Sequence, residues 1–173
     1  MKTTPPNNSQ ILRLIPGADF YDSWAVQAGD PSLSALGQFL KAIEATPNWV
    51  IQCMDLRNRV VEKLGLKNLG GLGAFDPAKP AVAYQPGDRV AIFTMFEQTF
   101  DEVLLGDKDK HLDVTLSVHR YVSASGDVQV TVTTVVHVHN LLGHLYMIPV
   151  KPMHKLIAPT VLRAVAQKSI ESR

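Results

Sequence analysis

Three histidines and one aspartate stand in two segments that the sequence predicts to be neighbouring β-strands. His111 and Asp113 open the first segment, and His137 and His139 close the second. Imidazole nitrogens and carboxylate oxygens are common ligands of divalent metals, and a carboxylate can also orient an imidazole that acts as a general base. The group therefore predicts either acid–base catalysis by His137, His139 and Asp113 or a divalent metal held by all four residues.

The strands that carry these residues are recognised by the alternation of apolar and polar side chains. Residues 111–122 place valines and leucines on one face and polar side chains on the other, and residues 128–138 repeat the pattern after a turn at 123–127. Alternation with a period of two is typical of strands in a sheet with one buried face. The two segments therefore predict an antiparallel hairpin with one core face.

The register of this hairpin follows from the same alternation, because a slip of one residue would bury the polar set. With Val122 opposite Val128, Asp113 faces His137, and the other two histidines face each other with their Cβ atoms about 5 Å apart. Three interpretations of this polar face stay open. It is the solvated surface of a sheet covered on one side, a metal or acid–base site, or an interface between two copies of the chain.

A second set of residues predicts a pocket between the sheet and the C-terminal segment. Large side chains suit an irregular cavity that takes a small hydrophobic or amphipathic molecule. The candidate ligand-binding residues are Phe93, Met95, Tyr146, Met147, Met153 and His154. The alternative is that these side chains fill the core and leave no pocket.

The C-terminal segment is basic as well as apolar. From residue 140 onward it holds five basic residues and one acidic residue, a net charge of +4, whereas the rest of the chain carries −3. A basic amphipathic helix can bind anionic lipid headgroups or an acidic partner, although such a face is more commonly just solvated. An interaction protein that uses this helix is therefore a third hypothesis.

Two helices are predicted ahead of the hairpin. An aromatic strand near residues 18–27 comes first, and amphipathic helices at 31–46 and 47–64 follow it. Apolar residues recur at three- and four-residue steps in both helices, and each begins with a proline, which has no backbone N–H to leave unpaired. Asp30 is the expected N-cap of the first helix.

The middle of the chain predicts a connector and two more strands. Residues 67–88 are rich in glycine and proline, as connectors are, with a short strand expected at 81–84. Alternating or β-branched residues predict strands at 89–97 and 102–105. An antiparallel meander therefore leads into the hairpin.

The last segment, residues 141–172, predicts a long helix with Asn140 as its N-cap. Three prolines inside it remove backbone donors, so we expect the helix to be kinked or divided. The whole pattern predicts an α+β fold: an antiparallel curved sheet with two short helices and a long kinked C-terminal helix packed on it, the helix-grip arrangement. We expect residues 1–10 to form a flexible tail and residues 11–173 a single domain.

Four stretches of the chain resemble one known family. They are LIPGADF, WVIQCMDLRNRVVEKLGL, DEVLLGDKDKHLDVTLSV and TVTTVVHVHNLLGHLYMIPVKPMHKLIAPTVLRAV. In them the chain resembles the bacterial domain of unknown function 2867 family, over nearly everything after the first ten residues. The resemblance implies a fold akin to START-like and polyketide-cyclase-like domains, which commonly hold an apolar ligand between sheet and helix. It implies no assigned activity and no cofactor.

Composition and charge exclude several classes of protein. The 173 residues, 46% of them hydrophobic, are enough to bury a core without disulfides or a structural metal, and 17 basic against 16 acidic residues give no field that attracts nucleic acid. The lone cysteine, Cys53, is compatible with the cytoplasm, and no apolar run approaches the ~20 residues of a membrane span. We therefore expect no nucleic-acid partner, no membrane span and no cofactor except a possible divalent metal, and we keep a homodimer open.

Overall fold

The computed structural model of the chain describes residues 1–63, 70–71, 76 and 78–167. Along the chain, a first strand is followed by two helices, then by a run of strands and a long C-terminal helix. Short 3-10 helices (η) lie before, between and after these elements. Their bounds are η1 Gln10–Leu14, β1 Phe20–Gln27, α1 Ala35–Glu44, α2 Asn48–Lys63, η2 Ala81–Ala83, β2 Arg89–Val90, β3 Phe93–Gln98, β4 Glu102–Lys108, β5 Leu112–Val122, β6 Val128–Val138, α3 Leu141–Leu162 and η3 Arg163–Ala166. The expected end of the second helix at residue 64 lies outside the described residues.

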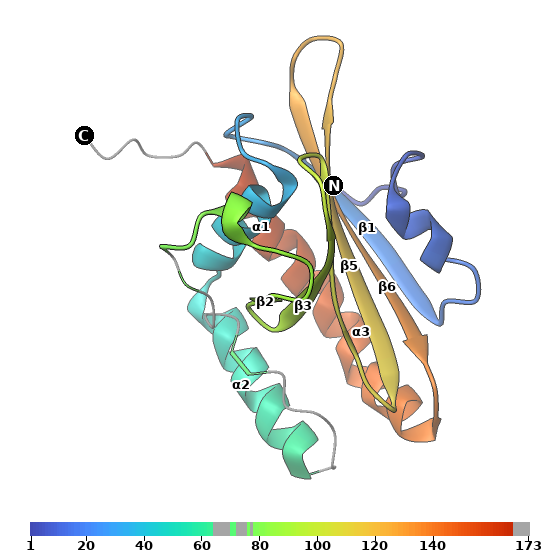
Figure 1. Cartoon of the computed structure of the whole chain (residues 1–173). Coiled ribbons are helices and arrows are strands. Elements are labelled where there is room, and N and C mark those ends of the chain that lie inside the picture. Colours follow the sequence, from blue (N-terminus) through green and yellow to red (C-terminus); the bar gives the residue numbers. More distant parts are fainter. Residues whose placement is uncertain (64–69, 72–75, 77, 168–173) are drawn as a thin grey trace.

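One six-stranded sheet organises the fold, in the order β1-β6-β5-β4-β3-β2. Every pair of neighbouring strands is antiparallel, and β6, the last strand along the chain, pairs with β1, the first. Helices α1 and α3 lie on one side of this sheet, and the N-terminal segment lies on the other (Figure 1). The predicted α+β fold with an antiparallel sheet and a long C-terminal helix is therefore confirmed.

The hairpin of β5 and β6 has the predicted register. Val122 pairs with Val128, and Asp113 pairs with His137. Beyond the last pair of the ladder, the His139 backbone N–H still donates to the His111 carbonyl at 2.9 Å. The alternation of apolar and polar side chains was sufficient to fix this pairing.

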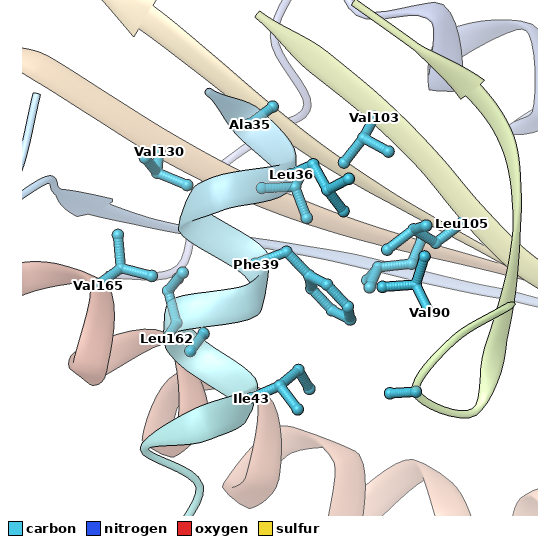
Figure 2. Packing of buried hydrophobic residues seen from close by; sticks show 14 of the residues in the cluster. Ala35, Leu36, Phe39, Ile43, Val90, Val103, Leu105, Val130, Leu162 and Val165 are labelled. Carbon is cyan, nitrogen blue, oxygen red and sulfur yellow. The ribbon is translucent and has the colours of Figure 1, made fainter. Parts of the chain in front are cut away.

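The main core lies between α1 and the sheet (Figure 2). Leu36, Phe39 and Ile43 recur at steps of three and four residues along α1, and Val103 and Leu105 of β4 belong to the same buried cluster. Leu36, Val103 and Leu105 are completely buried. Leu162, near the end of α3, belongs to the same cluster, so this core joins α1, the sheet and the end of α3.

The first helix begins later than its sequence predicts. The carboxylate of Asp30 accepts a hydrogen bond from the Ser32 backbone N–H at 3.0 Å, which makes a turn two residues long. Ser34 is the N-cap, because its hydroxyl accepts from the Gly37 N–H at 3.2 Å. The predicted cap at Asp30 is therefore wrong: an Asp–Pro pair also favours a turn, and the apolar stripe of α1 starts only at Leu36.

The predicted short strand at residues 81–84 is a 3-10 helix, η2, in the structure. Its Ala83 N–H donates to the Pro80 carbonyl at 2.9 Å. Small residues directly after a proline offer few side chains that could pack against a neighbouring strand. The 3-10 turn instead pairs a backbone N–H and a carbonyl within the segment itself.

The long helix α3 is continuous over Leu141–Leu162, so the expected division at its prolines does not occur. Asn140 is the N-cap as predicted, since its side chain accepts from the Gly143 N–H at 3.1 Å. Proline at 149, 152 and 159 frees the carbonyls four residues earlier, and those residues, Leu145, Ile148 and Lys155, are exposed on the outer side of the helix. Water can therefore take the place of the missing donors.

The N-terminal ten residues, which we expected as a flexible tail, lie against the sheet. The Met1 amino group donates to the Ala25 carbonyl at 2.6 Å, and the Thr3 N–H donates to the Ser23 carbonyl at 3.0 Å. Helix η1 then crosses the sheet face opposite α3, where Ile11 is completely buried. Local composition gave no sign of this packing, because most of the segment is polar.

The N-terminal segment also changes the environment of the polar face of the hairpin. Thr115, Ser117 and His119 are 6%, 0% and 3% exposed, although the alternation placed them on the face expected to be solvated. The expectation of a sheet covered on one side only is therefore wrong for the middle of β5. Both faces are buried there, and on the second face polar side chains lie beside a small apolar cluster of Ile11, Leu104 and Val135.

Candidate functional site

A small polar group interrupts the apolar sheet face beneath α3. Along β1 the residues on this face are Phe20, Asp22 and Trp24, and Asp22 pairs across the ladder with Thr134 of β6. Both polar residues are 5% exposed. A carboxylate and a hydroxyl therefore lie side by side in a part of the sheet that is otherwise apolar.

Helix α3 contributes His154 to this group. The Nδ1 atom of His154 lies 3.2 Å from Oδ2 of Asp22, and its Nε2 atom lies 3.3 Å from the hydroxyl oxygen of Thr134. The ring of Phe20 meets the imidazole edge-on, with centroids 5.8 Å apart. His154 thus links α3 to both β1 and β6, and the three side chains form one chain of polar contacts.

The carboxylate of Asp22 is only half satisfied. Its Oδ2 atom also accepts from the indole Nε1–H of Trp24 at 3.1 Å. Its Oδ1 atom is buried and has no hydrogen-bond partner among the described residues. An unpaired buried acceptor costs about 1–3 kcal/mol, and more when it is charged. The site therefore holds an open position for a hydrogen-bond donor.

Charge at this position is maintained by its neighbours. Burial raises the pKa of Asp22, but the hydrogen bond and charge of His154, the hydrogen bond from Trp24 and the charge of Lys2 together hold it below the usual range of an aspartate. At neutral pH Asp22 is therefore an ionised carboxylate, which only accepts hydrogen bonds. Chemically, the site can bind a donor at Oδ1 and can orient the imidazole of His154.

The sheet face next to this group is less tightly covered than the core under α1. Leu112, Val114 and Trp24 are half-buried, whereas Val118 and Val130 nearer α1 are 1% and 0% exposed. Leu112, Val114 and Trp24 are therefore the less buried apolar side chains of this face, on either side of the Asp22–Thr134 pair.

Of the residues predicted to line a pocket, only His154 belongs to this group. Met95 and Met147 are buried at 0% and 4% exposure, and Phe93 packs on the ring of Phe39 with centroids 6.2 Å apart. Met153 is 36% exposed on α3. These side chains fill or flank the core, which is the alternative that the sequence left open.

Tyr146 lies half-buried between the two long helices. Its hydroxyl accepts from Nε of Arg57 on α2 at 2.9 Å, and the guanidinium lies 5.4 Å from its ring centroid. Tyr146 therefore has a structural partner on α2, and its hydroxyl is directed to that helix.

On the opposite face of the sheet, the three histidines predicted to form one group with Asp113 contact different partners. Asp113 contacts His139, with Oδ1 3.2 Å from Nε2, and not the His137 that it faces in the ladder. Nε2 of His137 lies 2.8 Å from the carbonyl of Leu14 in η1. In the described part of the chain, no three or more histidine, cysteine, aspartate and glutamate side chains come together as a metal-binding group.

The remaining member of that group, His111, turns towards the start of α3. Its Nδ1 atom lies 3.2 Å from the side-chain oxygen of Asn140, and the residue is 9% exposed. A depression of about 190 Å³ beside Asp113 and His137 also takes in Arg13. The acid–base hypothesis for this face therefore keeps only the Asp113–His139 pair.

Sequence reasoning did not identify Asp22 and Thr134, although a signal for both was present. Asp22 stands between Phe20 and Trp24 on an apolar face, and Thr134 interrupts a run of valines at alternate positions of β6. A polar residue on the buried face of a strand marks either a buried hydrogen-bonded group or a site. The pairing of the first strand with the last was needed to place the two together.

Comparison with protein families gives a match over most of the chain. The model of the family described as protein of unknown function (DUF2867) covers residues 14–161 of the chain. A search of curated proteins finds no match. No helix in the described part of the chain has the length and apolar content of a membrane span.

Proposed function

The chain belongs to the DUF2867 family, and because that family has no assigned function, we propose from the geometry that it binds a small amphipathic molecule between the sheet and α3. One observation carries the proposal. Oδ1 of Asp22 is a buried, charged acceptor without a partner among the described residues, on a face that is otherwise apolar. A ligand that combines a donor group with an apolar body complements both properties.

The apolar body of the ligand is assigned to the half-buried part of the sheet. Leu112, Val114 and Trp24 offer aliphatic and aromatic surface there. The crossing of the sheet by α3 supports the finer assignment of the fold as helix-grip and START-like, in which a ligand lies between these two layers. Met95 is completely buried in the core under α1, so we assign the ligand to this end of the sheet and not to that core.

The polar end of the ligand must donate a hydrogen bond. Asp22 is ionised and already accepts at Oδ2 from Trp24, so a hydroxyl or an ammonium group fits at Oδ1. A carboxylate fits badly, because two negative charges would meet away from water. The proposal therefore predicts selectivity by head group among molecules with the same apolar chain.

The entry of such a molecule requires His154 to move. This side chain is 24% exposed and lies over the side chain of Asp22, which is 4% exposed. Pro149 and Pro152 leave α3 without two backbone hydrogen bonds directly ahead of His154, and helices bend most easily where such bonds are missing. The segment of α3 that carries His154 is therefore the mobile part of the site.

The test is a thermal shift assay with octanol, octylamine and octanoate as probes. Octanol and octylamine should raise Tm in a concentration-dependent way, by about 5–10 °C at a hundredfold excess over Kd, and octanoate should not. Asp22→Asn should weaken binding of octylamine at least tenfold. Asp113→Asn makes the same chemical change on the opposite face and serves as the matched control, with unchanged binding.

Two results would contradict the proposal. One is the absence of any shift with octanol and octylamine. The other is binding that Asp22→Asn leaves intact and Asp113→Asn weakens, which would move the site to the histidine-bearing face and revive the acid–base hypothesis.

A further inference from the structure

The outer side of α3 is apolar, which is unusual for a helix that already buries its other side on a sheet. Leu141, Leu145, Ile148 and Leu156 are 73%, 54%, 67% and 59% exposed. Steps of four, three and eight residues place them on one side of the helix, opposite the buried Met147. A helix that is apolar on both sides is normally covered on both, so this stripe is a binding surface.

The charges on α3 show what kind of surface would cover it. The helix contains Lys151 and Lys155 and no acidic residue, and no aspartate or glutamate occurs between Asp127 and Glu171. By its helical position Lys155 borders the apolar stripe, whereas Nζ of Lys151 lies 5.9 Å from the centroid of the Phe20 ring on the sheet side of the helix. An apolar stripe that is bordered by a lysine and has no carboxylate along it is complementary to an anionic lipid surface, where phosphates meet the lysine and the acyl region meets the leucines.

The same charges disfavour a second copy of the chain as the occupant. Two α3 helices packed along their stripes would bring lysines together with no carboxylate on either helix to pair with them. We propose that the outer face of α3 docks the protein on an anionic membrane surface, with Leu141, Leu145, Ile148 and Leu156 inserted at the interface and Lys155 on the headgroups. This inference is independent of the ligand site on the inner side of the helix.

The experiment is co-sedimentation of the full chain with phosphatidylcholine vesicles that contain or lack phosphatidylglycerol. We expect at least tenfold stronger partitioning into the vesicles with phosphatidylglycerol, and weaker partitioning at high salt. Ile148→Asp should reduce binding at least tenfold. Val82→Asp is the matched control, because Val82 is 81% exposed on η2, away from α3, and its replacement should leave vesicle binding unchanged.

Circular dichroism and Tm of both variants establish that they fold, since neither side chain is buried. The proposal is overturned if the chain binds no vesicles, if binding ignores the phosphatidylglycerol content, or if Ile148→Asp binds as the parent chain does. Sedimentation velocity tests the other occupant, a second copy of the chain. If the parent chain is a dimer and Ile148→Asp is a monomer, the stripe is a dimer interface, and the proposal is overturned.

Discussion

Each side of the sheet buries a carboxylate, and the two carboxylates have different surroundings. Beneath the N-terminal segment, Oε1 of Glu102 accepts the hydroxyls of Ser9 and Ser117 at 2.5 and 2.7 Å, and Oε2 accepts the Gln10 N–H at 2.9 Å. Beneath α3, Asp22 is hydrogen-bonded on one oxygen only. Burial does not distinguish them, because the two residues are 8% and 5% exposed.

The contrast shows that the two buried carboxylates differ in the completeness of their hydrogen bonding and not in their burial. Glu102 joins the N-terminal segment to β4 and β5, and both of its oxygens accept hydrogen bonds. Asp22 fastens α3 through His154 and still offers one acceptor. The two sites therefore differ in what their removal should change: stability for Glu102, and binding for Asp22.

The largest effect on stability is expected from Glu102→Ala. This change leaves two buried hydroxyls and one backbone N–H without their acceptor, and hydrogen bonds to charged groups contribute about 1.5–3 kcal/mol each before relaxation. We expect the free energy of unfolding in urea to fall by about 4 kcal/mol, with octylamine binding unchanged. Glu97→Ala, at an exposed ion pair with Arg13, is the control and should cost less than about 1 kcal/mol. A loss below about 1 kcal/mol for Glu102→Ala would remove the contrast.

A smaller and pH-dependent effect is expected at Asp22. The pKa of Asp22 is lowered in the folded chain, so its carboxylate stabilises the fold above the ordinary pKa of an aspartate, and this contribution is lost as the pH falls through the folded pKa. Relative to the parent chain, Asp22→Asn should lose about 1 kcal/mol at pH 7 and progressively less below about pH 4. Urea midpoints measured at both pH values check this. A difference that stays constant with pH would mean that the charge of Asp22 does not matter.

The smallest effect is expected from Thr134→Val, which keeps the shape of the side chain and removes its hydroxyl. His154 is partly exposed, so water can replace the lost partner of its Nε2 atom, and the cost should stay below about 1 kcal/mol. Thr134→Ser retains the hydroxyl and is the control. A loss of several kcal/mol would show that the polar group beneath α3 is mainly structural, like that of Glu102.

The hairpin and the start of α3 could be predicted because their signals are local. Alternation within residues 111–138 fixes the register that brings Asp113 opposite His137. Asn140 caps α3 by accepting from the N–H of Gly143, which is only three residues further along the chain. In each case the residues that interact are close in the sequence or in one uninterrupted pattern. The family resemblance could also be read from the chain, and it is confirmed over residues 14–161.

The polar group that we propose as a binding site could not be predicted, because it depends on contacts between distant segments. Asp22, Thr134 and His154 meet only when β1 pairs with β6 and α3 crosses both strands. The burial of the other face was missed for the same reason, since the hydroxyl of Ser9 donates to Glu102, 93 residues further along the chain. The residue types predicted chemistry at the histidines of the hairpin. Only the tertiary pairing shows that His154 is the histidine beside a buried carboxylate with an unpaired oxygen.

Fluorescence of Trp24 gives the most direct test of the ligand site. The chain has two tryptophans, so Trp49→Phe leaves Trp24, whose indole donates to Asp22, as the single reporter. Titration with octylamine should give a saturable change in Trp24 emission that Asp22→Asn abolishes and Asp113→Asn retains. Emission that does not respond to octylamine, or responds equally in the Asp22→Asn variant, would contradict the claim that the open oxygen of Asp22 receives a ligand.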